Sequence, residues 1–213
     1  MQICHHYKDA FLEWAVCRFD ESFDELSAMC ADDTLVAYAV ENFGSEKRRC
    51  EWLAARILVR RLVGYWVDVC YASDGKPMLA DDSRFLSISH TDGYVAVALH
   101  SKYNVGVDVE TIGAKVQRLY KRILGAAEID ALDRTNETVA MLLHWSAKES
   151  FYKIVGNRGG SYAANFSVSP FMVGESGSFS ISYTADGRLI KKLPVTYIVG
   201  GDYVFTLCVD EEE

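Results

Sequence analysis

Two acidic residues close the stretch VGVDVE, residues 105–110, and their spacing is the first sign of chemistry in this chain. Side chains alternate along a strand, so Asp108 and Glu110 share one face while the three valines point to the other. Two carboxylates on one strand face repel each other unless a positive group lies between them. The pattern therefore predicts a cation beside Asp108 and Glu110.

A third carboxylate occurs in WSAKESFYK, residues 145–153, where Glu149 and Lys153 lie four residues apart on one helix face. The alternative is an ordinary surface pair, which stabilises a helix by about 0.3 kcal/mol. Beside Asp108 and Glu110, however, Glu149 would complete an all-oxygen site of the kind that binds Mg²⁺ and bridges to phosphates. Lys153, one turn further on, could then neutralise charge on a phosphate leaving group.

Candidate anion-binding residues precede these carboxylates in the chain. His90 follows Ser87 and Ser89 where a predicted strand gives way to the turn SHTDG, and such a corner can hold a phosphate. Lys76 lies in the turn DGKP. Taken singly, His90 could be a structural hydrogen-bonding residue and Lys76 an ordinary surface lysine.

A basic helix is predicted over residues 46–64, with Gly64 at its C-terminal end. Its residues Arg49, Arg56 and Arg60 form one stripe, and Arg48 lies at a neighbouring angle. Arginine suits the recognition of phosphate, whose oxygens match its planar fork of donors. A solvated charged face is the alternative for this helix.

The net charge of −8 argues against general nucleic-acid binding. Two segments, 47–61 and 115–122, nevertheless hold 10 of the 22 lysines and arginines. An acidic chain with two basic segments is expected to use them on a specific anion or an acidic partner.

The remaining patterns predict an α+β chain in two like halves, residues 1–102 and 103–213, each with a small antiparallel sheet packed on helix. The first half is predicted to run from the helix into strands at 67–72, 84–89 and 94–100. The second runs from the strand 105–110 through helices ending at 156 into a meander of strands. No membrane-spanning run or signal peptide is expected, and the six scattered cysteines indicate reduced thiols.

Read in order, KRRCEWLAAR, GKPML, SISHTDGYVAVAL, VGVDVE and WSAKESFYK resemble the successive motifs of 4′-phosphopantetheinyl transferases. The resemblance covers about residues 46–156. It is to the larger, monomeric type that activates surfactin and enterobactin synthetases. It implies two halves related by a pseudo-twofold axis, and a cytoplasmic enzyme that binds neither nucleic acid nor a membrane.

The resemblance also implies the role of each matching residue. The metal ligands would be Asp108, Glu110 and Glu149. The residues acting in catalysis would be Glu149 as general base, directly or through a water, with Lys153 and Asp108. The residues binding coenzyme A would be Arg48, Arg56, Lys76, Ser89, His90 and Lys153. Spacing alone favours Arg48 over Arg49.

The implied reaction is the Mg²⁺-dependent transfer of the 4′-phosphopantetheine arm of coenzyme A to a serine of an apo acyl or peptidyl carrier protein. Adenosine 3′,5′-bisphosphate is released. The basic segment Lys115–Arg122 is expected to dock the carrier. Two alternatives stay open at this point: a non-catalytic coenzyme A or carrier-binding protein of the same fold, and a different Mg²⁺-dependent phosphotransferase or nuclease.

Overall fold

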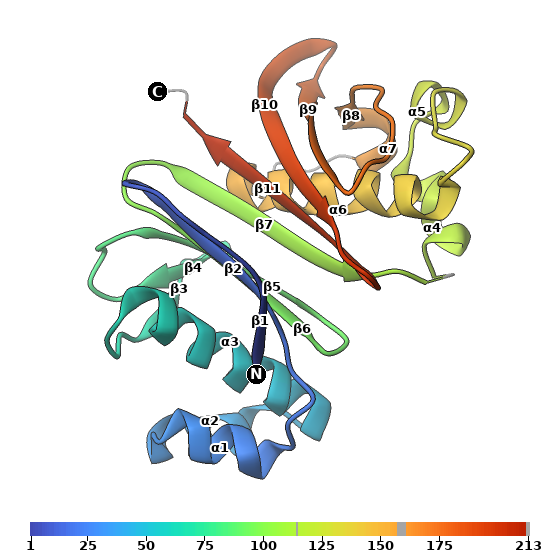
Figure 1. Ribbon diagram of the computed structural model, residues 1–213. Helices are drawn as coiled ribbons and strands as arrows, with labels where there is room; N and C mark the ends of the chain where they lie inside the picture. Colours follow the sequence, from blue (N-terminus) through green and yellow to red (C-terminus); the bar gives the residue numbers. More distant parts are fainter. Residues whose placement is uncertain (114, 157–160, 212–213) are drawn as a thin grey trace. The chain divides into compact units, whose positions relative to one another are not determined.

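The computed structural model describes residues 1–113, 115–156 and 161–211. The chain divides into two compact units, Met1–Lys102 and Tyr103–Glu213, which are described separately (Figure 1). Both units combine helices with an antiparallel sheet, so the predicted α+β class is confirmed. The twofold relation between the halves stays a prediction.

The first unit is built on a four-stranded antiparallel sheet in the order β1-β2-β6-β5. Its strands are β1 Gln2–Lys8, β2 Leu12–Arg18, β5 Phe85–Thr91 and β6 Tyr94–His100, with a separate hairpin of β3 Val69–Tyr71 and β4 Pro77–Leu79. Its helices are α1 Phe23–Cys30, α2 Asp33–Asn42 and α3 Glu46–Val63. Apolar residues of α3 such as Leu53 and Leu58 form a core with Val97 of β6.

Helix α3 begins and ends where its sequence predicts. The Ser45 side chain accepts a hydrogen bond from the backbone N–H of Arg48, which satisfies one of the free donors of the first turn. Gly64 follows the helix with φ of 90°, a left-handed conformation that glycine adopts without a Cβ penalty. The predicted C-terminal glycine is therefore confirmed.

Residues 1–45, for which the sequence patterns predict no element, form the hairpin β1–β2 and helices α1 and α2. Strand β1 is an edge strand whose residues are exposed or half-buried, so it lacks the apolar alternation that marks a strand in sequence.

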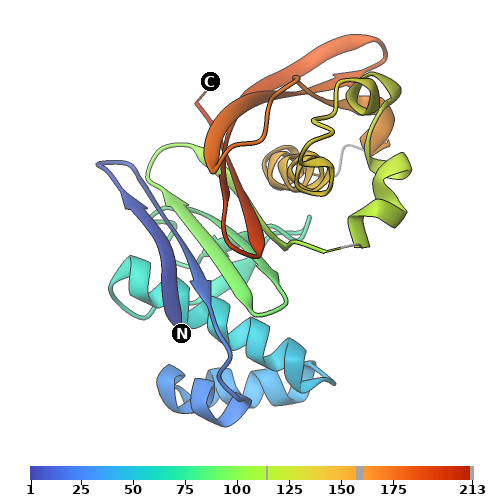
Figure 2. The same cartoon turned by 45° about the vertical axis from the view of Figure 1, so that its right-hand side comes forward.

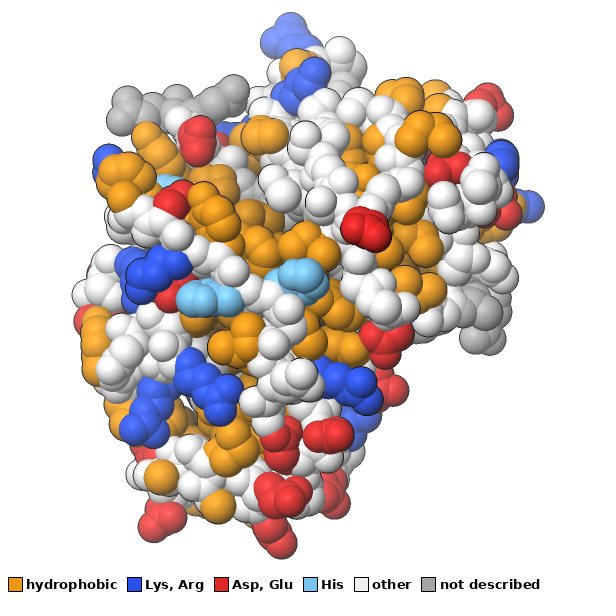
Figure 3. Space-filling model, in the orientation of Figure 1, with side chains coloured by type: hydrophobic (Ala, Val, Ile, Leu, Met, Phe, Trp, Pro, Cys, Tyr) orange, Lys and Arg blue, Asp and Glu red, His pale blue; other side chains and the backbone are white. Residues whose placement is uncertain are grey.

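Acidic side chains gather over α1 and α2 at the bottom of Figure 3. The exposed acids there include Asp24, Asp33 and Glu41.

The second unit is a five-stranded antiparallel sheet in the order β7-β11-β10-β9-β8, crossed by a long helix (Figure 2). Its strands are β7 Asn104–Thr111, β8 Phe166–Val168, β9 Ser176–Ala185, β10 Arg188–Val199 and β11 Tyr203–Asp210. Its helices are α4 Lys115–Ile123, α5 Ala126–Asp130, α6 Glu137–Val155 and α7 Tyr162–Asn165. The long helix α6 packs against β7 and β11.

The apolar segment VTYIVG, residues 195–200, predicts one strand of the meander, but strand β10 begins seven residues earlier, at Arg188. The added segment contains two lysines and Pro194, which obscure it in the sequence. In the structure Pro194 pairs with Ser180 of β9, while the pairing of β10 with β11 starts only at Val195. Pro194 therefore lies where β10 is an edge, which is where a sheet tolerates proline.

Two chemical properties of the chain follow from the fold. All six cysteines are free thiols, and four of them are buried, as predicted for reduced core residues. None of the helices in the described ranges combines the length and hydropathy that a bilayer crossing needs.

Candidate active site

Strand β7 and helix α6 come unusually close together at Gly106. A Cβ atom placed on Gly106 would lie only 1.9 Å from the backbone oxygen of Ser150 in α6. Glycine is therefore required at this position, because any side chain would push the helix off the strand. The close approach holds the turn of α6 around Ser150, which carries Glu149 and Lys153, against the strand that carries Asp108.

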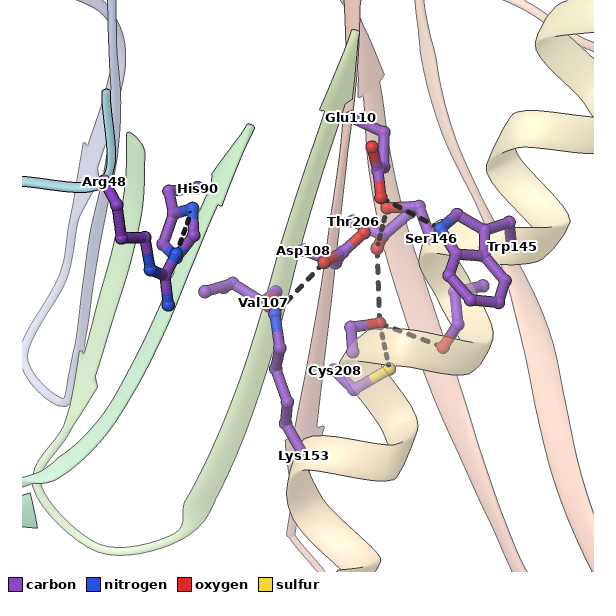
Figure 4. A network of polar contacts seen from close by, with 12 residues as sticks. Arg48, His90, Val107, Asp108, Glu110, Trp145, Ser146, Lys153, Thr206 and Cys208 are labelled. Atoms are coloured by element: carbon purple, nitrogen blue, oxygen red, sulfur yellow. Dashed lines mark hydrogen bonds and ion pairs between the residues drawn. The ribbon is translucent and has the colours of Figure 1, made fainter. Parts of the chain in front are cut away.

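Asp108 and Lys153 form the direct link between strand and helix (Figure 4). The Lys153 Nζ atom lies 3.0 Å from Asp108 Oδ1 and donates to the backbone oxygen of Val107 at 2.7 Å. The Asp108 residue is only 4% exposed. A buried carboxylate needs such a partner, because its charge would otherwise be poorly solvated.

Glu110 is positioned by an aromatic donor from the same helix. The indole Nε1 of Trp145 donates to Glu110 Oε1 at 2.9 Å (Figure 4). Register pairs Asp108 with Thr206 and Glu110 with Val204 of β11, so the two acids occupy successive positions on the face of the sheet that α6 covers.

The charges of two neighbouring carboxylates act on Glu149. Burial raises the pKa of Glu149, and the negative charge of Asp108 raises it further, with a smaller contribution from Glu110. A hydrogen bond from the Tyr162 hydroxyl and the charge of Lys153 act in the opposite direction. Asp108 and Glu110 therefore lie close enough to Glu149 to repel its charge, and their use as common metal ligands stays a prediction.

The donor set of this cluster fits a hard cation. Three carboxylates supply oxygen ligands, and a divalent ion would relieve the repulsion that raises the pKa of Glu149. Within the described ranges, no three acidic, histidine or cysteine side chains are already arranged as a metal site. Asp108, Glu110 and Glu149 each accept a hydrogen bond from a protein donor in this structure.

The first unit brings Arg48 and His90 together. Arg48 Nη1 lies 2.5 Å from His90 Nε2 (Figure 4). Glu51 Oε2 lies 3.3 Å from His90 Nδ1. Since a guanidinium only donates, Nε2 accepts from Arg48, and Nδ1 then carries the proton that faces Glu51. Arg49 instead donates to the backbone oxygens of Phe43 and Val40.

The strand before His90 ends two residues later than predicted. The sequence predicts its end at Ser89, whereas strand β5 continues through Thr91, and His90 pairs with Val95. Ser89 is its neighbour on a regular strand and so points to the opposite face, where it is 7% exposed. The two side chains therefore do not form a common corner.

Arg56 is held inside the first unit. Its guanidinium carbon lies 4.0 Å from the centroid of the Trp52 ring, and its Nη2 donates to the hydroxyl of Tyr71 at 2.7 Å. Burial lowers the pKa of Arg56. Through Tyr71 it ties α3 to the β3–β4 hairpin, whose turn carries Lys76.

Several residues of these clusters escaped the sequence analysis. Glu51, Trp145 and Tyr162 contact predicted site residues directly. Trp145 lies inside WSAKESFYK and Glu51 lies in the basic helix, so both were within reach of the motif analysis. Tyr162 follows a segment, 157–160, that lies outside the described residues, and nothing in its spacing signals contact with Glu149.

Comparison with known proteins agrees with this arrangement of an acidic strand and a Glu–Lys helix. A model of the 4′-phosphopantetheinyl transferase superfamily matches residues 104–208, which include β7 and α6. A 4′-phosphopantetheinyl transferase AcpT from Salmonella typhi is 30% identical over 144 residues, covering 64% of this chain and 70% of the relative.

Two further relatives are more distant. An AcpT from Escherichia coli O157:H7 is 29% identical over 122 residues, covering 54% of this chain and 60% of its own length. A mouse L-aminoadipate-semialdehyde dehydrogenase-phosphopantetheinyl transferase is 28% identical over 128 residues, covering 49% of this chain and 41% of its own length. The fold and the site define an α+β chain with carboxylates on strand β7 and helix α6. The chain belongs to the 4′-phosphopantetheinyl transferase superfamily.

Proposed function

We propose that this chain is a Mg²⁺-dependent 4′-phosphopantetheinyl transferase of the larger type, acting on an apo carrier protein. The observation that supports the metal assignment is that the charges of Asp108 and Glu110 act on Glu149, next to the ion pair of Asp108 with Lys153. When bound there, Mg²⁺ would supply positive charge for the pyrophosphate of coenzyme A, which needs it most as the bond to the leaving group breaks.

The reaction transfers a phosphopantetheine group between two oxygens. The serine hydroxyl of the carrier forms a bond to the β-phosphorus of coenzyme A. The bond from that phosphorus to the bridging oxygen breaks, and adenosine 3′,5′-bisphosphate leaves. Glu149 takes the serine proton, directly or through a water.

Lys153 and Asp108 assist this step from the two elements that Gly106 holds together. The ammonium of Lys153 neutralises charge on the departing phosphate, and Asp108 keeps that ammonium in place through the 3.0 Å ion pair. Asp108 is also a metal ligand in this proposal, so its removal affects both functions.

The first unit would bind the nucleotide end of coenzyme A. Arg48 and His90 would contact the 3′-phosphate, with support from their closeness in the structure. Lys76, from its exposed hairpin turn, would add a second positive charge. Ser89 and Arg56 are proposed to support binding of the same nucleotide end. Arg56 would do so by holding the β3–β4 hairpin through its hydrogen bond to Tyr71.

The direct test is the intact mass of apo carrier proteins incubated with the chain, coenzyme A and Mg²⁺. The expected result is a gain of one phosphopantetheine, which is lost on chelation of the metal and in the Glu149→Gln variant. Glu137→Gln, an exposed acid at the start of the same helix, is the matched control and should keep activity. Unchanged transfer under chelation would remove the metal from the proposal.

The role of His90 has its own test. His90→Ala should raise the KM for coenzyme A more than it lowers kcat, because the 3′-phosphate is remote from the reacting bond. Dephospho-coenzyme A lacks that phosphate and should respond little to the change. Equal losses with both substrates would show that His90 does not bind the phosphate.

Docking of the carrier is assigned to α4, which holds the basic segment Lys115–Arg122. Lys121 and Arg122 are exposed, whereas the side chains of Lys115 and Arg118 lie outside the part that the structure describes.

We also propose that the chain works as a monomer in the cytoplasm. Its six free thiols suit a reducing compartment, and sedimentation would test the monomer.

A further inference from the structure

Four buried polar side chains link helix α6 to strand β11 beneath the acidic cluster. They are Ser146, Ser150, Thr206 and Cys208, and all four are fully buried at 0% exposure. Burying polar groups lowers stability unless each is hydrogen-bonded, so four of them side by side require an explanation. Figure 4 shows them as one connected chain of contacts.

The geometry of these contacts determines where each proton lies. Ser150 Oγ donates to the backbone oxygen of Ala147 at 3.0 Å, and Thr206 Oγ1 donates to Ser150 Oγ at 3.2 Å. Since a hydroxyl carries one proton, Ser146 must donate to Thr206 across their 2.9 Å contact. The thiol of Cys208 likewise donates to Ser150 across 3.4 Å. Each of the four groups therefore donates one hydrogen bond.

The location of this chain ties it to the candidate site. Thr206 pairs in register with Asp108, and Cys208 pairs with Gly106. Ser150 is the residue whose backbone oxygen would meet a side chain at Gly106. The hydroxyl chain thus contacts the sheet beside Gly106 and Asp108 of β7. Gly106 determines how closely α6 packs on the strand, and Asp108 forms the ion pair with Lys153.

The same helix carries the groups that must be placed. Ser146 directly follows Trp145, which donates to Glu110, and Ser150 directly follows Glu149. A slide of α6 by even a fraction of a residue would change the 2.9 Å contact of Trp145 and the 3.0 Å pair of Lys153. Apolar contacts tolerate such a slide, whereas directional hydrogen bonds do not.

We propose that Thr206, through the hydroxyl chain Ser146–Thr206–Ser150–Cys208, is a positioning residue that sets the register of α6 over β7 and β11 for metal and phosphate binding. This inference rests on the proposed function, because it concerns the placement of the same carboxylates. Thr206 contacts neither substrate nor metal and acts through the helix.

The test replaces the central hydroxyl. Thr206→Val keeps a similar shape but leaves Ser146 without its acceptor, and Thr206→Ser restores the hydroxyl. The control is Ile181→Val, a fully buried residue of β9 outside the hydroxyl chain. If Ile181→Val lowers the melting temperature less than Thr206→Val does, Ile181→Ala replaces it, so that the control and the test variant are equally destabilised.

Two readouts distinguish positioning from general stability. The first is the Mg²⁺ concentration that gives half of the thermal stabilisation of the coenzyme A complex. It should rise about 10-fold in Thr206→Val, as is usual when support behind metal ligands is lost. The second is the ¹⁵N indole resonance of Trp145, assigned with Trp145→Phe among the four tryptophans. It should shift because its contact with Glu110 changes.

Thr206→Ser should return both readouts to wild-type values, and the Ile181 control should change neither. Should Thr206→Val fail to fold, Ser146→Ala is measured instead, with a smaller change in the same direction. Unchanged readouts in these variants, or equal changes in the control, would overturn the proposal. If wild type shows no Mg²⁺ response, the proposed metal function fails, while the indole resonance still decides on positioning.

Discussion

Glu149 is the residue at which the electrostatics of the acidic cluster come together. Burial and the charges of Asp108 and Glu110 raise its pKa, and the hydrogen bond from Tyr162 holds the pKa down. Burial raises the pKa of Tyr162, and the charge of Glu149 and the same contact raise it further, so the tyrosine stays a hydrogen-bond donor. The pKa of Glu149 therefore depends in part on a residue that lies outside the sequence motifs.

We expect Tyr162→Phe to move the acidic limb of the pH–rate profile to higher pH. The variant removes a donor that stabilises the carboxylate, so the pKa of Glu149 rises further, and protonation then removes both base and metal ligand at a higher pH. The measurement is kcat/KM for coenzyme A from pH 5 to 8. Tyr152→Phe, on the neighbouring ring, is the control and should leave the limb in place. A Tyr162→Phe limb at or below the wild-type pH would contradict the assignment.

At the scale of elements, the close contact of β7 with α6 is the feature on which the second unit's site depends. Gly106→Ala is expected to lower the free energy of unfolding by about 1–3 kcal/mol, as forced overpacking does, because its Cβ would meet a backbone atom that cannot rotate away. It should also reduce transfer strongly, since Lys153 and Glu149 move with the helix.

Gly44→Ala is the matched control, because nothing lies within 4 Å of a Cβ at that position. Thermal melts and transfer assays of both variants make the comparison, and the control should change stability by less than about 0.5 kcal/mol. A Gly106→Ala protein with wild-type stability and activity would show that the helix can shift without effect.

The elements also show what the sequence can and cannot predict. Helix α3 and strands β5, β6 and β7 follow from strong periodicity, and the i,i+4 spacing placed Glu149 and Lys153 on one face. Strand β1 was missed because its residues are not buried on one side, and the start of β10 because Pro194 hides it.

The remaining misses concern contacts that depend on tertiary structure. Tyr162 reaches Glu149 only once the chain has folded around α6, and no local pattern encodes that meeting. Ser89 and His90 looked like one corner because the strand was expected to end before Thr91. The buried position of Arg56 depends on Trp52 in the same helix and on Tyr71, fifteen residues further along in strand β3.

At the scale of the whole chain, a net charge of −8 must coexist with the acidic partner that the two basic segments are expected to bind. Opposite charge at a docking surface mainly speeds association and makes it depend on salt. The double variant Lys121→Glu/Arg122→Glu on α4 is therefore expected to lower kcat/KM for the carrier by about tenfold at low ionic strength, with kcat for coenzyme A little changed.

The control reverses the same charge elsewhere in the second unit. Arg188→Glu/Lys192→Glu alters two exposed residues of β10 and should have a much smaller effect. Rates measured from low salt to about 0.5 M should converge for wild type and the α4 variant, because salt screens surface charge. Equal losses in both double variants would point to net charge instead of a docking surface.

The central claim, that the acidic cluster is a cation site, is tested most directly by the melting temperature of wild type and Asp108→Asn with and without Mg²⁺ plus coenzyme A. Asparagine keeps an oxygen that can accept from Lys153 but removes the charge that raises the pKa of Glu149. Without ligand the variant should therefore be at least as stable as wild type. With Mg²⁺ and coenzyme A at 100 times the dissociation constant, wild type should gain about 2.7 kcal/mol, and the variant should gain much less. Equal stabilisation of both proteins, or none in wild type, would contradict the account.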